Sequence, residues 1–534
     1  MTNTDWQTFT QTYFVDPKTN FAFDFSQMSY DLKTLKTLDT KLEDAILQMK
    51  QLENGSIANL DEKRMVGHYW LRASELAPTV EIKKEIDDNF NNIIKFVADV
   101  HKGTIKPEFT AHFKHLLIIG IGGSALGPQL AVQALQSEET KMTAHFFDNT
   151  DPEGMYETLR KIPDLKETLC LVISKSGGTK ETRNGQLIAR AAFENRGLDP
   201  NKAFVAVTCK DSILDKTAKN ESWLARFPMW DWVGGRTSLF SAVGLLPLAL
   251  IGFDVKKLCD GAKHMDNMTR SKDWQENPAA IMAALWYLAT NGKGEKAMVI
   301  LPYRDRLELM SKYLQQLVME SLGKEHDRDG KVVEQGLTVY GNKGATDQHA
   351  YIQQLRDGLN NFFVVFIKVL KDFYTPHSEN DMSAIQFEVE KNVTAGDYLL
   401  GLHLGTRSAL TEKNRKNITI TLEEINEFSI GMLIALFERS VGLYAELINI
   451  NAYHQPGVEA GKKAAQAILD LQLEILKCLE EKPGQLSTVD QIAISLNKSD
   501  KKESIFHILQ HLAANKRISC EKAKTVFDCR YGAS

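Results

Sequence analysis

A loop rich in hydroxyls and glycines follows the apolar run TLCLVI and has the composition of a phosphate-binding loop. Residues 174–182 read SKSGGTKET, in which Ser174, Ser176 and Thr179 carry hydroxyls and Lys175 carries a positive charge. Glycines expose backbone N–H groups, and such groups at the start of a helix attract anions. The spacing differs from the nucleotide P-loop pattern G-x-x-x-x-G-K-[ST]. We therefore predict a site for a phosphate monoester, with a Ser/Thr-rich helix cap as the alternative.

A second glycine-rich loop follows another apolar run, HLLII. Residues 120–128 read GIGGSALGP, which matches G-x-G-x-x-A, and Asp148 ends the next strand-like run. That combination keeps a dinucleotide-binding interpretation open, although the motif alone is weakly specific. The glycines, Gly123 among them, permit close approach of the backbone, and Ser124 would lie near a helix start. A tightly packed strand-to-helix turn is the structural alternative.

An arginine and a glutamate are candidates for chemistry on the ligand. Arg236, in VGGRTSLF, lies between a Gly-Gly turn and an apolar segment, so we expect it to face inward towards negative charge. Glu320 lies in YLQQLVMESLGKE, where Gln316 precedes it by one helical turn and shares its face. Glu320 is therefore a candidate general base, and an exposed carboxylate is the alternative.

Further polar residues lie near predicted helix starts. His349 follows a glycine-rich loop in GNKGATDQHAYIQQL, and Gln455 and Lys462 flank the helix start in YHQPGVEAGKKA. A packed or surface histidine and a capped amphipathic helix are the structural alternatives.

Composition argues against several classes of protein. The chain has 534 residues, of which 43% are hydrophobic, and a formal net charge of −5. It can therefore bury a large core in two or more domains, and it has no global positive field for nucleic acid. The first residues lack a secretory pattern, and no apolar stretch is long enough for a bilayer. The six cysteines are scattered without CxxC or metal spacing, which predicts reduced thiols in a cytoplasmic protein and no bound metal.

The order of apolar runs predicts the fold class. Strand-like runs between residues 115 and 208 alternate with helix-length segments, and the pattern returns between residues 296 and 369. Nearly continuous apolar strands separated by helices are typical of parallel sheets covered on both faces. Residues 1–105 have helical spacing, a long helix is predicted over 423–450, and the residues after 484 predict a small helical appendage.

Taken in order, these segments resemble those of the phosphoglucose isomerase family. GIGGSALGP, SKSGGTKET, VGGRTSLFSAVG, DQHA, GVEAGK and, in outline, QQLVMES with the following GK look like family motifs, all within residues 115–465. The resemblance implies an α/β fold with two sugar isomerase (SIS) subdomains, each a parallel sheet sandwiched by helices. It divides the chain into a helical N-terminal arm (1–110), a first SIS subdomain with phosphate-binding loops (111–285), a second with the catalytic Glu, His and Lys (286–470), and a C-terminal helical extension (471–534).

The resemblance also implies roles for residues in these motifs. Glu320 would be the base, Arg236 would stabilise an enediolate, and His349 and Lys462 would be the other catalytic groups. The substrate-binding residues would be Gly123, Ser124, Ser174, Lys175, Ser176, Thr179, Gln316 and Gln455. Asp347 stands where the family commonly has a glycine before QHA, which leaves the local turn open.

The implied activity is the reversible isomerisation of glucose 6-phosphate to fructose 6-phosphate, in glycolysis and gluconeogenesis. His349 and Lys462 would serve ring opening as acid–base groups, and a proton would then move between C1 and C2 through a cis-enediolate. The resemblance implies no cofactor, a cytoplasmic homodimer with shared active sites, and no nucleic-acid or membrane partner. The alternatives are an NAD(P)-dependent oxidoreductase, a non-catalytic sugar-phosphate-binding SIS protein, and an isomerase of another sugar phosphate such as mannose 6-phosphate.

Overall fold

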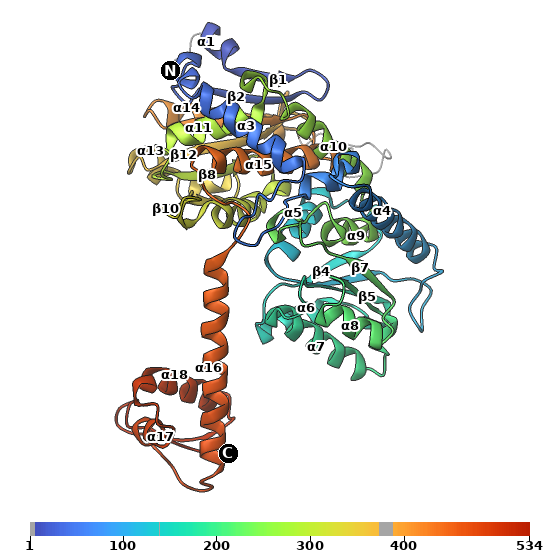
Figure 1. The fold of residues 1–534 in the computed structure, drawn as a ribbon, viewed down its shortest axis with the longest axis vertical. Helices are drawn as coiled ribbons and strands as arrows, with labels where there is room; N and C mark the ends of the chain where they lie inside the picture. The colour runs from blue at the N-terminus through green and yellow to red at the C-terminus, as the bar shows by residue number, and fades with distance from the viewer. Residues whose placement is uncertain (1–5, 138, 373–387, 534) are drawn as a thin grey trace. The chain divides into compact units, whose positions relative to one another are not determined.

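The chain forms two compact units, Met1–His454 and Gln455–Ser534 (Figure 1). The computed structural model describes residues 6–137, 139–372 and 388–533, and in one helix it leaves out the side chains of residues 459, 460 and 462. The division between the units falls inside the predicted second subdomain, so residues 455–470 belong to the same compact unit as the C-terminal extension. The predicted subdomain boundaries themselves stay a prediction.

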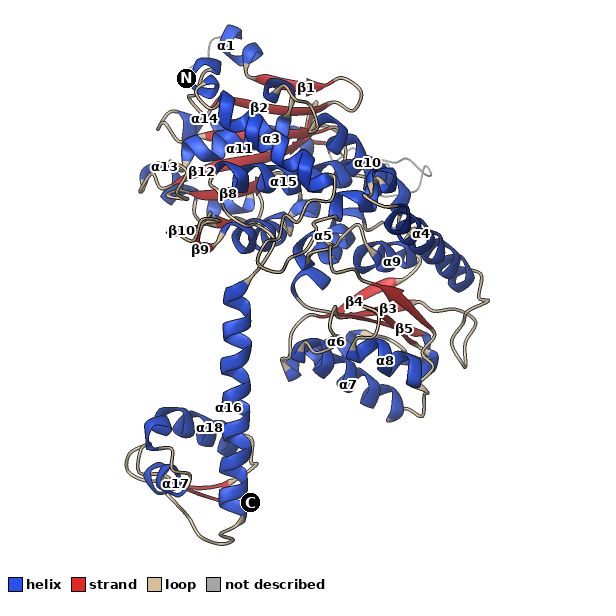
Figure 2. Cartoon of the chain, in the orientation of Figure 1, coloured by secondary structure: helices blue, strands red, loops and turns tan. Residues whose placement is uncertain are grey.

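The first sheet of the larger unit has five parallel strands in the order β4-β3-β5-β6-β7. Figure 2 shows β3, β4 and β5 among them. Its strands are β3 (His115–Ile119), β4 (Thr143–Phe147), β5 (Thr168–Ile173), β6 (Phe204–Thr208) and β7 (Ala225–Pro228). The helices that alternate with these strands or follow them in the chain are α5 (Leu126–Leu135), α6 (Pro152–Lys161), α7 (Lys180–Glu194), α8 (Ile213–Asn220) and α9 (Ala242–Ile251). β5 and β6 are buried along their whole length, as expected of parallel strands covered on both faces.

The second sheet has six strands in the order β1-β2-β15-β12-β8-β11. β15, β12, β8 and β11 are parallel, while β2 pairs antiparallel with β15 and β1 with β2. The strands are β1 (Tyr13–Asp16), β2 (Phe21–Gln27), β8 (Ala297–Pro302), β11 (Val339–Tyr340), β12 (Phe362–Val369) and β15 (Asn417–Leu422). The predicted α/β class with parallel sheets is therefore confirmed.

Further helices and short strands complete the part of the larger unit that contains the second sheet. The helices are α10 (Val255–Met268), α11 (Pro278–Ala289), α12 (Met310–Leu314), α13 (Ile352–Asp357), α14 (Ala395–Thr411) and α15 (Glu427–Leu447). The short strands are β9 (Lys324–His326), β10 (Val332–Gln335), β13 (Glu388–Glu390) and β14 (Val393–Thr394).

The expectation of helical structure throughout residues 1–105 is wrong between residues 13 and 27. The helices α1 (Trp6–Gln11), α2 (Leu32–Lys36), α3 (Asp39–Glu53) and α4 (Val80–His101) do form. Between α1 and α2, however, β1 and β2 join the second sheet, and Phe23 pairs with Ile420. Asp24 interrupts the apolar pattern of β2, and its carboxylate accepts a hydrogen bond from Arg407, which makes the buried charge tolerable.

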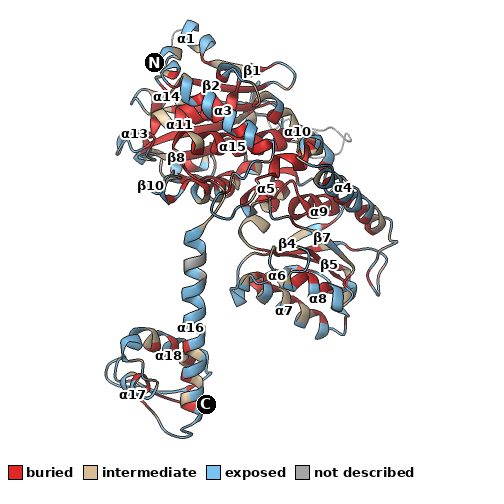
Figure 3. Ribbon diagram, viewed as in Figure 1, coloured by how far each residue is buried: buried red, intermediate tan, exposed pale blue. Residues whose placement is uncertain are grey.

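One continuous hydrophobic core runs through both sheets and the helices α9, α11 and α15, which Figure 3 shows as buried. Among the described residues, α15 is the one helix that is long and apolar enough to cross a membrane, with a mean hydropathy of 1.3. Because 89% of that stretch is buried inside the protein, its composition is explained by its place in the core.

The smaller unit has its own core. It contains α16 (Pro456–Glu480), α17 (Val489–Ser495), α18 (Lys502–Ala514) and a hairpin of β16 (Ser519–Glu521) with β17 (Arg530–Gly532). Leu471, Ile475, Leu509 and Tyr531 are among the buried residues of this core. Residues 463–470 of α16 are exposed (Figure 3). The tail is thus a helical appendage, as predicted, with an added hairpin.

Candidate active site

The glycine-rich loop after β3 lies against the Gly-Gly-Arg loop. It forms a short 3₁₀ turn, Gly122–Ser124, before α5. A Cβ atom on Gly123 would lie 2.0 Å from the carbonyl oxygen of Gly235, and one on Gly122, at φ +58°, would lie 3.0 Å from the amide nitrogen of Gln316. Protein groups therefore fill the space that a side chain would need. These contacts account for both glycines without a bound dinucleotide.

Arg236 and Glu320, predicted from separate segments, form an ion pair. Arg236 lies in the 3₁₀ turn Gly235–Thr237 and is 6% exposed. Its Nε donates to Oε2 of Glu320 at 3.0 Å, and its terminal nitrogens donate to the carbonyl oxygens of Ala452 at 2.8 Å and His454 at 3.4 Å. The Glu320 side chain is 23% exposed. The guanidinium is thus fixed by backbone acceptors, while the carboxylate borders solvent and is accessible to a ligand.

Glu320 ends a π-helical turn. α12 continues directly into this turn, Gln315–Glu320, in place of the ordinary α-helix that the spacing predicts. Leu317 and Val318 are buried and anchor the turn, whereas Gln316 and Glu320 are only partly buried. π-Helical turns inserted in α-helices occur frequently at functional sites, where the wider turn changes the direction of side chains.

The predicted phosphate loop follows β5 and is shaped by its own hydroxyls. Oγ of Ser174 accepts from the N–H of Gly177, and Oγ of Ser176 accepts from the N–H of Gly178, both at 3.1 Å. Thr179 immediately precedes α7, but its side chain makes no capping hydrogen bond to that helix. Helix capping therefore does not explain Thr179, which leaves its hydroxyl for another role.

Lys175 ties the phosphate loop to the segment before Arg236. Its ammonium nitrogen donates to the carbonyl oxygens of Asp231 and Val233, both at 3.1 Å. Burial lowers the pKa of Lys175, and the carboxylate of Asp231 opposes that shift. The charge of Lys175 is thus directed at protein carbonyls. A direct contact with substrate, as the sequence suggests, stays a prediction.

The other predicted residues lie on other elements. His349 is exposed at the end of the 3₁₀ turn Thr346–His349, and its imidazole makes no hydrogen bond or ion pair with the described residues. Gln455 is the residue that precedes α16 at its N-terminus, and Lys462 lies within α16. The side chain of Lys462 lies outside the described part of the chain.

Sequence reasoning assigned no role to two buried charged residues near these loops. Asp347 is 1% exposed and accepts from the backbone N–H of Asn342 at 2.9 Å and the hydroxyl of Tyr351 at 2.5 Å, so it fixes the turn that the sequence left open. Lys324 is buried too and donates to the backbone of Glu320. A charged residue placed directly after an apolar helix is the signal that points to Lys324.

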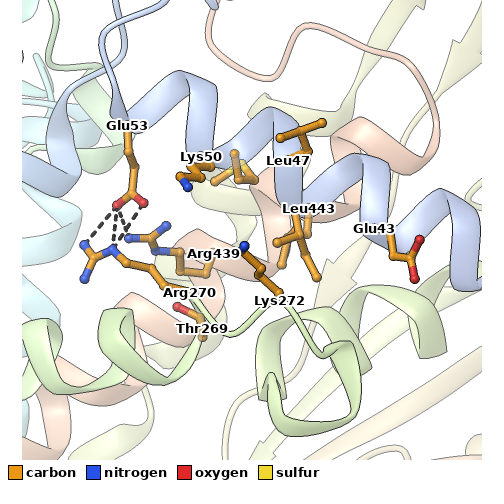
Figure 4. Close-up of a pocket in the computed structure, with 11 residues that line it drawn as sticks. Glu43, Leu47, Lys50, Glu53, Thr269, Arg270, Lys272, Arg439 and Leu443 are labelled. Atoms are coloured by element: carbon orange, nitrogen blue, oxygen red, sulfur yellow. Dashed lines mark hydrogen bonds and ion pairs between the residues drawn. The ribbon is translucent and has the colours of Figure 1, made fainter.

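A cavity of about 510 Å³ lies elsewhere, between α3, α15 and the residues after α10 (Figure 4). Glu53 accepts there from Arg270 at 2.9 Å and from Arg439, and Leu47 and Leu443 add apolar walls. None of the predicted site residues lines this cavity, so it does not mark the predicted site. Across the described residues, no group of three or more His, Cys, Asp or Glu side chains is arranged to hold a metal ion.

Comparison with known proteins identifies the family. The family model described as phosphoglucose isomerase matches residues 24–477. A glucose-6-phosphate isomerase of Geotalea daltonii is 54% identical over 529 residues, which is 98% of each chain, and one of Gloeothece citriformis is 52% identical over 96% of this chain and 95% of its own. A crystal structure of a glucose-6-phosphate isomerase from Chlamydia trachomatis is 25% identical, with a TM-score of 0.78 over 88% of this chain and 92% of that chain. The chain therefore belongs to the phosphoglucose isomerase family.

Proposed function

We propose that this chain interconverts glucose 6-phosphate and fructose 6-phosphate, the reaction for which its relatives are named. The observation that carries the proposal is the Arg236–Glu320 ion pair, at 3.0 Å, beside two contacting glycine-rich loops. An aldose–ketose isomerisation moves one proton between C1 and C2 without net oxidation, and it needs a base next to a fixed positive charge. The reaction serves glycolysis and gluconeogenesis.

Glu320 is the proposed base. One of its oxygens, Oε2, accepts from Arg236, and its side chain borders solvent. A carboxylate can take the proton from C2 on one face of the sugar and return it at C1, because both carbons lie in the plane of a cis-enediolate. A single positioned base therefore suffices for both directions.

Arg236 is proposed to stabilise the enediolate oxygen. Its guanidinium is held by the carbonyl oxygens of Ala452 and His454 in addition to Glu320. A cation that is fixed before the reaction stabilises developing negative charge without reorganisation, which is the larger part of electrostatic catalysis.

The substrate phosphate is assigned to the loop 174–179, with Gly123 and Ser124 next to the Arg236 loop. Ser176 is exposed and Thr179 is not used in capping, so both hydroxyls are accessible to an anion. Gln316, beside Gly122, is proposed to contact the sugar. Anchoring the phosphate holds C1 and C2 against the base, so remote binding energy contributes to the rate.

Ring opening is assigned to His349 and Lys462, with Gln455 contacting the sugar, in a cytoplasmic homodimer with shared sites. The exposed position of His349 supports its use by a second subunit. α16 also exposes apolar side chains, with Val458 44%, Leu469 48% and Leu473 63% exposed. Such a surface supports contact with another protein chain. Sedimentation at micromolar concentration should give a dimer, and a monomer with full activity would exclude shared sites.

A coupled assay tests the activity. Fructose 6-phosphate is supplied in the presence of a metal chelator and no added cofactor, and glucose 6-phosphate is detected with an auxiliary dehydrogenase added afterwards to quenched samples. We expect turnover under these conditions, and mannose 6-phosphate in a parallel assay measures sugar specificity. No conversion by soluble, folded enzyme would favour the sugar-phosphate-binding alternative. Protection against heat by NAD(P) but not by sugar phosphate would favour an oxidoreductase.

A further inference from the structure

Lys324 is a buried cation at the end of the helix that carries Glu320. It is the first residue of β9 and is 6% exposed. Its ammonium nitrogen donates to the carbonyl oxygen of Glu320 at 2.7 Å and to that of Ser321 at 2.8 Å. The last carbonyls of a helix lack partners within the helix, and a nearby lysine can supply them. Lys324 therefore holds the backbone of the residue whose carboxylate pairs with Arg236.

This is an unfavourable position for a positive charge. Burial, and to a smaller extent the charge of Arg236, lower the pKa of Lys324 to about 7, although Glu320 and Asp61 oppose the shift. Within the described residues, no carboxylate lies within ion-pair distance of its ammonium group, so its partners are the two carbonyls. An apolar side chain of similar length would fill this space without the cost of desolvating a charge. The benefit that offsets this cost lies in the two carbonyl contacts, which an amine makes in either protonation state.

We propose that Lys324 is a positioning residue that fixes the direction from which the Glu320 carboxylate approaches the sugar. The inference rests on the proposed role of Glu320 as the base. Lys324 holds the carbonyls of Glu320 and Ser321, and Arg236 holds the Glu320 carboxylate. The base is thus restrained at both its backbone and its side-chain end.

Loss of this restraint should affect turnover more than binding. The phosphate loop 174–179 is held by its own hydroxyls and by Lys175, which do not depend on Lys324. A shift of about 1 Å in a catalytic group can lower the rate about 10²-fold. We therefore expect Lys324→Met to lower kcat by roughly 10²-fold, with KM for fructose 6-phosphate changed by less than about threefold.

Lys416 provides a matched control. It is a half-buried lysine whose pKa is also lowered by burial, to about 8, and it donates to the hydroxyl of Tyr30, which is not one of the predicted site residues. Lys416→Met should therefore show a comparable loss of stability with kcat unchanged. Lys324→Arg keeps N–H donors at this position and should recover at least a tenth of the wild-type kcat.

The experiment measures kcat, KM and thermal unfolding for wild type, Lys324→Met, Lys324→Arg and Lys416→Met. If Lys324→Met is insoluble, Lys324→Gln, which keeps one N–H donor group on a shorter stem, replaces it, with a smaller loss of kcat expected. Amide hydrogen exchange across residues 315–323 should quicken in the Lys324 variant and not in Lys416→Met. A Lys324→Met enzyme with wild-type kcat, or one that raises KM alone, overturns the positioning role. An inactive wild type instead refutes the proposed function, so the two failures are distinct.

Discussion

Replacing Glu320 with glutamine removes the charge of the proposed base while keeping the shape of the side chain. In the structure Glu320 accepts from Nε of Arg236 at 3.0 Å, and the amide oxygen of a glutamine can accept the same hydrogen bond. Arg236 also donates to the carbonyl oxygens of Ala452 and His454, so its guanidinium keeps those partners. We therefore expect the fold and the binding of the phosphate to survive the substitution.

The expected loss of activity is much larger than the expected loss of stability. A positioned general base contributes about 10²–10⁴-fold to the rate, which corresponds to about 3–5 kcal/mol in the activation barrier. The substitution replaces a charged hydrogen bond by a neutral one, which should lower the free energy of unfolding by about 1 kcal/mol. Because 23% of the Glu320 side chain is exposed, solvent screening reduces that loss further. A fold with ordinary stability tolerates such a change, so unfolding cannot account for a loss of two orders of magnitude or more.

Steady-state kinetics in both directions, together with thermal unfolding, test this prediction. Glu320→Gln should lower kcat by roughly 10²–10⁴-fold with KM nearly unchanged. Glu325→Gln is the matched control, because Glu325 lies on the adjacent strand, its side chain is 74% exposed, and its ion-pair contact is with His326 at 3.7 Å. That variant should keep wild-type kinetics. Turnover by Glu320→Gln within a few-fold of wild type would remove Glu320 from the mechanism.

Other predictions concern the loops around the ion pair. Replacing Ser174, which is buried and shapes the loop through the N–H of Gly177, and Thr179, a proposed phosphate ligand, together with alanine should raise KM for fructose 6-phosphate at least about tenfold, in keeping with the loss of a hydrogen bond to a charged group and of the loop's shape; an unchanged KM would place the phosphate elsewhere. Lys175→Met removes two hydrogen bonds to backbone carbonyls and should lower the free energy of unfolding by about 1–3 kcal/mol in urea titrations, whereas unchanged stability would leave Lys175 as a substrate ligand only. Gly123→Ala should abolish activity and reduce soluble yield, because its Cβ would lie 2.0 Å from a carbonyl oxygen. Gly401→Ala is the control and should fold normally, because a Cβ atom on Gly401 would have no other atom within 4 Å. Equal soluble yield and activity of the two glycine variants would contradict the argument from close contact at Gly123.

The fold was most predictable where strands are buried on both faces. β5 and β6 are continuous apolar runs and are read directly from the sequence. β2 is not, because Asp24 breaks its apolar pattern, and the residue that matches this charge, Arg407, lies 383 positions away. The periodicity of neighbouring residues cannot reveal a partner so far away in the sequence, so the N-terminal strands of the second sheet were not predicted.

The residues of the candidate site were predicted from their motifs, but their relations were not. The sequence places Arg236 and Glu320 84 positions apart, and their ion pair emerges only when the Gly-Gly-Arg loop packs beside the π-helical turn. The sequence also could not predict where the ammonium group of Lys175 points, because its partners are backbone carbonyls and every residue has one. The position of Lys324 directly after an apolar helix is a sequence signal, but its two carbonyl partners could not be predicted either.

Backbone carbonyls therefore explain how a small number of charged side chains can be held rigidly near one another. Arg236, Lys175 and Lys324 each donate to two main-chain oxygens, whose positions are set by the fold. For Arg236, these fixed partners mean that the proposed stabilisation of the enediolate needs no reorientation of the guanidinium. In contrast, the Glu320 carboxylate is held by side-chain contact with Arg236 and is partly exposed. In the proposed mechanism it is thus the group that can exchange its partner when an anionic enediolate forms, while Arg236 stays fixed, which is the division of roles that a proton-transfer base and a preorganised electrostatic site require.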